Sequence, residues 1–154
     1  DPILVGGWIQ PECPFMAKEE LFRFKPFGAL IRALGAFPVA RGKGDTGAID
    51  HAVELIRSGR VVTIFPDGHR SKTGELLKLK SGAVVIASQT GSDILPCAIK
   101  MGKRKFLRRP VVVRYGKVIP YQDLGITGKT PSEIKGANRL LTAELTRLLE
   151  EIHV

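Results

Sequence analysis

Apolar and polar positions alternate in blocks along the chain, and the blocks predict strands and helices in turn. Short apolar runs, typical of strands, lie at residues 15–17, 37–41, 61–64, 93–99 and 111–120. Apolar side chains at helical spacing occur at residues 27–34, 46–58 and 83–87. Because a strand, a helix and a strand follow one another from residue 37 to residue 64, we expect a parallel, right-handed crossover.

The last element is predicted from its start signal as well as its periodicity. Thr130 can cap a helix, Pro131 suits its first position, and Glu133 completes a capping box. The apolar stripe that we expect to face the core consists of Ile134, Ala137, Leu141, Leu145, Leu148 and Ile152.

The segment around residues 22–34 combines aromatic and basic side chains. Phe22, Phe24 and Phe27 precede the apolar positions Leu30 and Leu34, and Arg23, Lys25 and Arg32 flank them. Such a pattern suits a membrane interface. The alternative is a helix that packs on the sheet, which we favour for Leu30 and Leu34. We expect the Phe side chains near residues 22–27 to be the interfacial ones.

Length and composition limit the class of protein. A chain of 154 residues, 44% of them hydrophobic, predicts one domain with a real core, residues 1–154. Its net charge of +9 favours anionic partners. Cys13 and Cys97 are too few for a disulfide framework and indicate a reducing compartment. No apolar run reaches the length of a membrane span, about 18 residues.

The candidate functional side chains are most closely spaced just after the apolar run at residues 61–64. The seven residues are Phe65, Pro66, Asp67, Gly68, His69, Arg70 and Ser71. Pro66 lacks a backbone donor and Gly68 permits unusual dihedral angles, so a strand stops here. Ligands of α/β sheets bind at the carboxyl ends of strands. Gly68 lets the backbone approach an anion, and the planar guanidinium of Arg70 suits a phosphate.

These seven residues resemble the Phe-Pro-Glu-Gly-Thr-Arg-Ser signature of the lysophosphatidic-acid acyltransferases (1-acylglycerol-3-phosphate acyltransferases). Three further stretches resemble that family's other blocks in the right order: Asp1-Pro2, residues 35–41 (GAFPVAR) and residues 94–99 (ILPCAI). The resemblance covers residues 1 to about 120. It implies a glycerol-phosphate-acyltransferase-like α/β fold with a single-domain, mixed, mostly parallel sheet flanked by helices.

The resemblance also implies a reaction. An acyl group would pass from acyl-CoA or acyl carrier protein to the free hydroxyl of lysophosphatidic acid, giving phosphatidic acid for phospholipid biosynthesis. Arg41, Gly68 and Arg70 would bind the acceptor phosphate, while Phe65, Pro66, Asp67 and Ser71 would support the site. Lys43, in a basic loop, is a further candidate for the phosphate. No cofactor and no metal are implied.

The catalytic pair is only partly present in the sequence. The family's motif is a His, four residues and an Asp, and Asp1 resembles that Asp. The base would therefore be a His upstream of residue 1, with Asp1 fixing its tautomer, and we expect the chain to be incomplete at its N-terminus. Asp67 stands for the usual Glu and His69 for the usual Thr. We consider His69 as a replacement base but favour a loop or surface role for it.

Other interpretations stay open at this point. The acceptor could be glycerol 3-phosphate or another lysolipid, or the chain could be a non-catalytic lipid-binding relative. The basic cluster at residues 100–109 could be a solvated hairpin tip, or it could contact a membrane surface or a carrier protein. It could also bind nucleic acid, but it lacks a regular aromatic platform, so we expect no nucleic-acid partner. We expect a peripheral or N-terminally anchored protein at the cytoplasmic face of a membrane.

Overall fold

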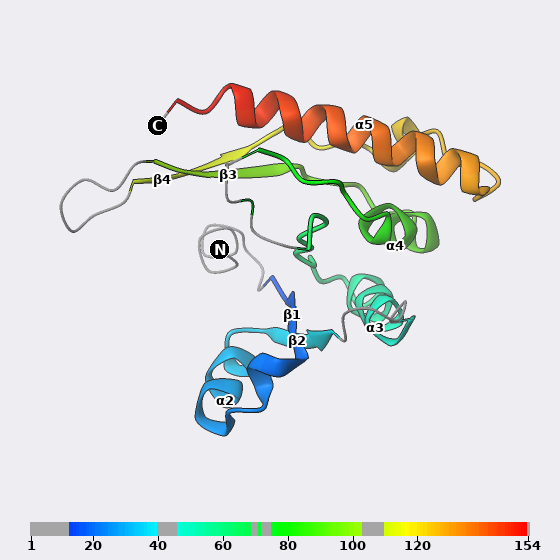
Figure 1. Ribbon diagram of the computed structural model, residues 1–154. Coiled ribbons are helices and arrows are strands. Elements are labelled where there is room, and N and C mark those ends of the chain that lie inside the picture. The colour runs from blue at the N-terminus through cyan, green and yellow to red at the C-terminus, as the bar shows by residue number, and fades with distance from the viewer. Residues whose placement is uncertain (1–12, 40–45, 69–70, 72–74, 103–109, 154) are drawn as a thin grey trace. The chain divides into compact units, whose positions relative to one another are not determined.

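The computed structural model describes residues 13–39, 46–68, 71, 75–102 and 110–153. Contacts divide the chain into two compact units, residues 1–65 and residues 66–154. Each unit has its own helices and its own two-stranded sheet (Figure 1). The α/β class expected from the sequence is confirmed, and the assignment of residues 1–154 to one acyltransferase domain stays a prediction.

The first unit is built on a short parallel sheet. Strand β1 (Phe15–Lys18) pairs with strand β2 (Ala36–Val39), and Phe15 lies opposite Ala36. The 3-10 helix η1 (Glu19–Phe22) and helix α2 (Lys25–Ala33) connect the two strands. Helix α3 (Thr46–Arg57) follows β2, and Gly59 takes a left-handed φ of 84° after its end. Buried side chains of this unit include Phe15, Ile31, Ala36, Phe37, Ala52 and Val53.

The predicted buried strand at residues 61–64 is wrong in its extent. Within the described residues, only Thr63 of this run pairs, through a parallel bridge to Phe15, and its N–H donates to the Pro14 carbonyl at 2.8 Å. Val61 is 43% exposed. The physical reason lies in the partner segment, because Pro14 has no N–H group with which to continue a ladder.

The buried face of helix α2 is not the face that the sequence predicts. Gly28 and Ile31 are buried, whereas Leu30 and Leu34 are 56% and 47% exposed. The expectation that Leu30 and Leu34 pack on the sheet is therefore wrong. Gly28 explains the orientation, since a Cβ atom there would lie only 2.8 Å from the Phe22 carbonyl oxygen. This close approach turns the Gly28 face of the helix toward η1.

The second unit packs one long helix on an antiparallel hairpin. Strands β3 (Cys97–Met101) and β4 (Val111–Tyr115) pair with Ile99 opposite Val113, and an Ile94–Ile119 bridge extends the pairing. Helix α4 (Gly82–Thr90) precedes the hairpin, and the 3-10 helix η2 (Tyr121–Leu124) and helix α5 (Pro131–Glu150) follow it. Figure 1 shows α5 running along the hairpin.

The core of the second unit lies under α5, and the predicted stripe is confirmed. Leu148 and Ala137 are 1% exposed, and Leu141 is 3% exposed. The capping box is also present, because the Thr130 hydroxyl accepts from the Glu133 N–H while the Glu133 carboxylate accepts from the Thr130 N–H. The buried cluster consists of Leu79, Val84, Ala87, Ala98, Leu124, Ile126, Ala137, Leu141, Leu145, Leu148 and Ile152.

Candidate functional site

The segment at residues 65–71 crosses from one compact unit to the other. Phe65 is the last residue of the first unit and Pro66 the first of the second. Pro66 and Asp67 form a turn, and both are half-buried. Gly68 has a φ of 67°, in the left-handed region that favours glycine. The local conformation at Gly68 therefore agrees with the predicted stop after the apolar run.

Most of the predicted polar site residues lie outside the described residues. They are Asp1, Arg41, Lys43, His69 and Arg70. Their roles, and the idea that two Arg side chains meet at one phosphate, stay predictions. Ser71 is described and half-buried.

Lys80, to which the sequence analysis assigns no role, lies against this segment. The Lys80 N–H donates to the Pro66 carbonyl at 2.8 Å. A Cβ atom at Gly68 would lie 3.6 Å from Lys80 Cε and 3.7 Å from Nζ. The sequence contains one weak signal, because Lys80, Ser81, Gly82 and Ala83 are similar to residues at the same place in the acyltransferase family. Nothing in that pattern indicates which distant segment the lysine side chain meets.

Cys97 does not suit the role of an acyl-carrying nucleophile at neutral pH. Burial raises the pKa of the Cys97 thiol to about 11, so the thiolate is scarce. Cys13 Sγ lies 2.7 Å from Thr63 Oγ1 in a hydrogen bond beside the bridge to β1. Both thiols are free.

The histidines that the structure describes, His51 and His153, lie at the surface. The His51 side chain is 49% exposed, and its Nδ1 lies 3.8 Å from Glu54 Oε2. The edge of its ring contacts Phe37, with ring centroids 4.9 Å apart. His153 is exposed beyond the end of α5.

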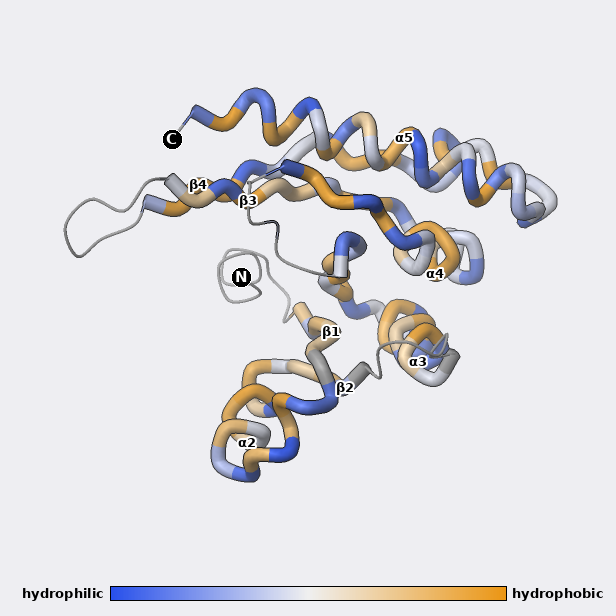
Figure 2. The backbone as a smooth tube through the Cα atoms, viewed as in Figure 1, coloured by the Kyte–Doolittle hydropathy of each residue, from blue (hydrophilic) through white to orange (hydrophobic). Residues whose placement is uncertain are grey.

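An exposed apolar surface lies on the first unit. We call it the α2 surface and define it as Phe24, Phe27, Leu30 and Leu34, which are 69%, 42%, 56% and 47% exposed. Arg23 and Lys25 are exposed beside it, and the Arg32 guanidinium lies 5.2 Å from the Phe22 ring centroid. Figure 2 shows α2 as a mixture of strongly hydrophobic and strongly hydrophilic positions.

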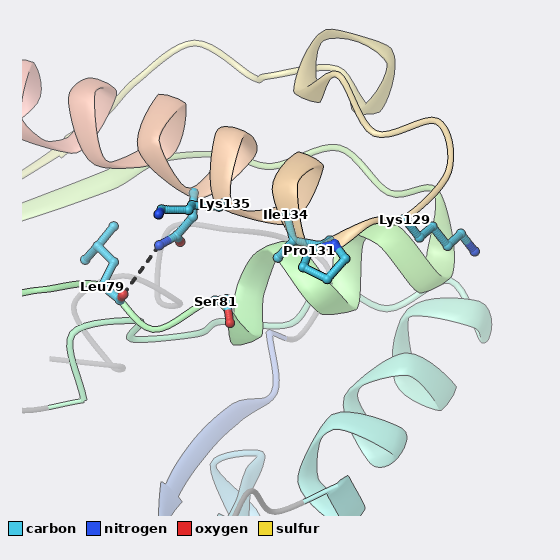
Figure 3. A pocket seen from close by; sticks show the side chains of 7 residues that line it. Leu79, Ser81, Lys129, Pro131, Ile134 and Lys135 are labelled. Atoms are coloured by element: carbon cyan, nitrogen blue, oxygen red, sulfur yellow. Dashed lines mark hydrogen bonds between the residues drawn. The ribbon is translucent and has the colours of Figure 1, made fainter.

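A cavity of about 460 Å³ lies in the second unit at the start of α5 (Figure 3). Asn138 Nδ2 donates to the Leu79 carbonyl at 3.4 Å beside it, and the buried Asn138 Oδ1 has no hydrogen-bond partner in the described part of the unit. The lining residues are Leu79, Ser81, Lys129, Pro131, Ile134, Lys135 and Asn138. None of them belongs to the segment at residues 65–71, so we assign this cavity no part in the reaction.

The basic cluster at residues 100–109 is described only in part. Lys100 has a structural role, because its Nζ donates to the Ile152 carbonyl at 2.9 Å and to the Leu149 carbonyl at 3.3 Å, near the end of α5. Gly102 and Pro110, whose N–H and carbonyl bond at 2.9 Å, close the hairpin. Residues 103–109 lie outside the described residues, so the contact with a membrane or a carrier protein stays a prediction.

The described residues lack a metal-binding cluster and a membrane-spanning helix. No group of three or more His, Cys, Asp or Glu side chains among them could hold a metal ion. No helix in the same residues is long and apolar enough to cross a bilayer.

Comparison with known proteins gives consistent matches. The profile of the family described as "Acyltransferase" matches residues 1–100. The chain is 34% identical over 127 residues to a 1-acyl-sn-glycerol-3-phosphate acyltransferase of Bacillus subtilis, covering 80% of this chain and 63% of the relative. It is 32% identical over 156 residues to a protein of the same name from Streptococcus pneumoniae, covering 98% of this chain and 57% of the relative.

A solved structure shares the fold. The 1-acyl-sn-glycerophosphate acyltransferase of Thermotoga maritima matches with a TM-score of 0.65 and 22% identity, covering 91% of this chain and 56% of that one. The chain thus spans about three fifths of the length of the curated relatives that it matches.

Proposed function

The chain belongs to the acyltransferase family, and from this premise we propose that the full-length protein acylates lysophosphatidic acid to phosphatidic acid. The observation that carries the proposal is the segment at residues 65–71. It follows Thr63, which pairs with β1, and it contains Gly68 in the left-handed conformation. This backbone suits close contact with an anion such as the acceptor phosphate.

The chemistry assigns three tasks to the protein. A base takes the proton of the acceptor hydroxyl while its oxygen attacks the thioester carbonyl. Hydrogen-bond donors stabilise the oxyanion that forms, and its collapse releases the thiol of the donor. In the family's motif the base is a His five positions before the residue that Asp1 resembles, and Asp1 would orient it. The donor is a thioester, either acyl-CoA or acyl carrier protein.

The acceptor phosphate requires cations. A phosphate monoester carries a charge between about −1.5 and −2 at neutral pH, and arginine binds it through two parallel hydrogen bonds. We therefore propose Arg41 and Arg70 as phosphate ligands. His69 and Lys43 are not needed for this scheme.

Thiol release from an acyl-thioester on addition of lysophosphatidic acid tests the reaction in the full-length protein. Glycerol 3-phosphate and other lysolipids, offered as separate acceptors, test the alternative acceptors. We expect Arg70→Ala to raise KM for lysophosphatidic acid at least tenfold, about 1.4 kcal/mol. An unchanged KM would show that Arg70 does not bind the acceptor phosphate. The absence of thiol release by the wild type with every acceptor would overturn the proposed function.

We also propose that the protein works at the surface of a membrane, on its cytoplasmic face, because its lipid acceptor resides there. The α2 surface supports this location, since four large apolar side chains are at least 42% exposed on one short segment. Arg23 and Lys25 provide positive charge beside it for anionic headgroups.

Vesicle binding by the full-length protein tests the location. The double variant Phe24→Ser/Phe27→Ser removes apolar area from the α2 surface. The control Val118→Ser changes a side chain that is 53% exposed in the other unit. We expect the double variant to bind phosphatidylglycerol vesicles at least tenfold more weakly, because burying one such side chain contributes about 1.5–3 kcal/mol. Equal binding by all three proteins would contradict the assignment.

A further inference from the structure

Lys80 is held against the segment at residues 65–71 by the backbone. Its N–H donates to the Pro66 carbonyl at 2.8 Å, which joins residue 80 to the turn two positions before Gly68. The side chain then follows the glycine, with Cε and Nζ at 3.6 Å and 3.7 Å from the position of a Gly68 Cβ atom. The ammonium group therefore lies beside the backbone of the one residue whose lack of a side chain leaves room for an anion.

The chain on both sides of Lys80 is fixed in the second unit. Leu79 is only 6% exposed within the core, and its carbonyl accepts from Asn138 Nδ2 on α5. Helix α4 begins at Gly82. Because Leu79 is packed and α4 follows closely, the backbone of Lys80 is held beside Pro66 by the fold of the unit.

The charge of Lys80 is available to a ligand. Lys80 is exposed, and it takes part in none of the ion pairs found among the described residues. Lys78, the nearest residue of the same charge in sequence, is also exposed. It is not among the described residues within 4 Å of the position of a Gly68 Cβ atom. The two lysines thus differ in position and not in charge or exposure.

We propose that Lys80 is a phosphate-binding residue that selects a phosphorylated acceptor. This inference rests on the proposed function, since it names a further ligand of the same acceptor. Lysine is a compact point charge with three donors. Apart from Lys80 and the chain neighbours of Gly68, no described atom lies within 4 Å of the position of a Gly68 Cβ atom. A phosphate also occurs in coenzyme A, so the experiment has to separate acceptor from donor.

The test uses the full-length protein and three variants: Lys80→Gln, Lys80→Arg and the matched control Lys78→Gln. Kinetics are measured with lysophosphatidic acid and with monoacylglycerol, which lacks the phosphate, at saturating acyl-CoA and then with acyl-CoA varied. We expect Lys80→Gln to raise KM for lysophosphatidic acid at least tenfold with little change in kcat and in KM for monoacylglycerol. Lys80→Arg should restore most of the affinity, and Lys78→Gln should resemble the wild type.

Binding of lysophosphatidic acid in detergent micelles, measured by calorimetry, provides a readout that needs no turnover. Phosphate-dependent binding that Lys80→Gln weakens tenfold would support the inference even if the wild type transfers no acyl group, in which case only the proposed reaction fails. Equal binding by Lys80→Gln and wild type would overturn the inference. An equal loss with both acceptors, or a rise in KM for acyl-CoA alone, would overturn it as well.

Discussion

Helices α2 and α5 both have an amphipathic sequence, but the structure treats their apolar faces in opposite ways. Along α5, Ala137, Leu141 and Leu148 are at most 3% exposed. On α2, Phe27 and Leu30 are 42% and 56% exposed. Leu34, just past the end of the helix, is 47% exposed. The pattern of a helix therefore shows that an apolar face exists, and the surrounding chain decides whether the protein itself covers it.

The covered face of α5 and the exposed face of α2 are expected to serve different functions. The face of α5 supplies the core of the unit that holds Gly68 and Lys80. The α2 surface supplies area that a membrane would cover. Stability is therefore expected to depend on α5, and membrane binding on α2.

Truncation of matched leucines should separate the two helices most strongly. Leu148→Ala removes a side chain that is 1% exposed and should lower the free energy of unfolding by about 3 kcal/mol. Leu30→Ala should change it by less than about 0.5 kcal/mol, because Leu30 is largely exposed. Urea titration followed by circular dichroism measures both values. A loss at Leu30 as large as at Leu148 would show that the chain itself covers α2.

One glycine in each helix should respond to the same substitution with opposite sign. Gly28→Ala places a Cβ atom 2.8 Å from the Phe22 carbonyl oxygen, and such crowding costs about 1–3 kcal/mol. Gly136→Ala meets no described atom within 4 Å and should stabilise α5 by about 0.5–1 kcal/mol. Thermal unfolding measures both. A stabilised Gly28→Ala variant would contradict the close approach of α2 to η1.

The N-caps offer a smaller contrast. Thr130→Ala removes the side-chain cap of α5 and should cost about 1 kcal/mol. Helix α2 begins after Phe24, which has extended dihedral angles but no side-chain cap bond. Phe24→Ser should therefore raise stability by about 0.5–1 kcal/mol while it weakens vesicle binding. If stability and vesicle binding fall together, Phe24 packs within the protein.

The Glu133 carboxylate, which caps α5, should make the stability of the protein depend on pH. Hydrogen bonds from the Thr127 side chain and from the Thr130 and Gly128 N–H groups lower the pKa of Glu133 to about 2, from the ordinary 4.5. A lowered folded-state pKa contributes stability above the unfolded value, and this contribution is lost as the pH falls from about 4.5 toward about 2. Stability measured between pH 6 and pH 2 should fall less steeply in Glu133→Gln than in the wild type. Equal slopes would exclude this linkage.

Local signals predicted the helices well. The capping box at Thr130 and Glu133 acts within a few residues of chain, so the sequence contains the whole interaction. The predicted strand at residues 61–64 failed for the opposite reason. Its apolar composition is suitable, but pairing depends on a partner, and Pro14 limits that partner.

The candidate site shows the same division. Gly68 was identifiable from its place after an apolar run, because the conformation that it requires is local. The contact of Lys80 with Gly68 was not predicted, because it depends on a hydrogen bond to Pro66, fourteen residues away in sequence, and on the packing of Leu79. The pattern of apolar and polar positions predicts that the lysine side chain is exposed, but it does not predict which residue that side chain contacts.

The amino-acid sequence by itself determined the order of the elements, the ends of the helices, the apolar stripe of α5 and the resemblance to an acyltransferase family. Each of these depends on residues that are close in sequence or on the order of short motifs. The tertiary structure decided which face of α2 is covered, how much of residues 61–64 pairs, and which lysine lies at Gly68. These features depend on burial and backbone pairing, and both require a partner from a distant part of the chain.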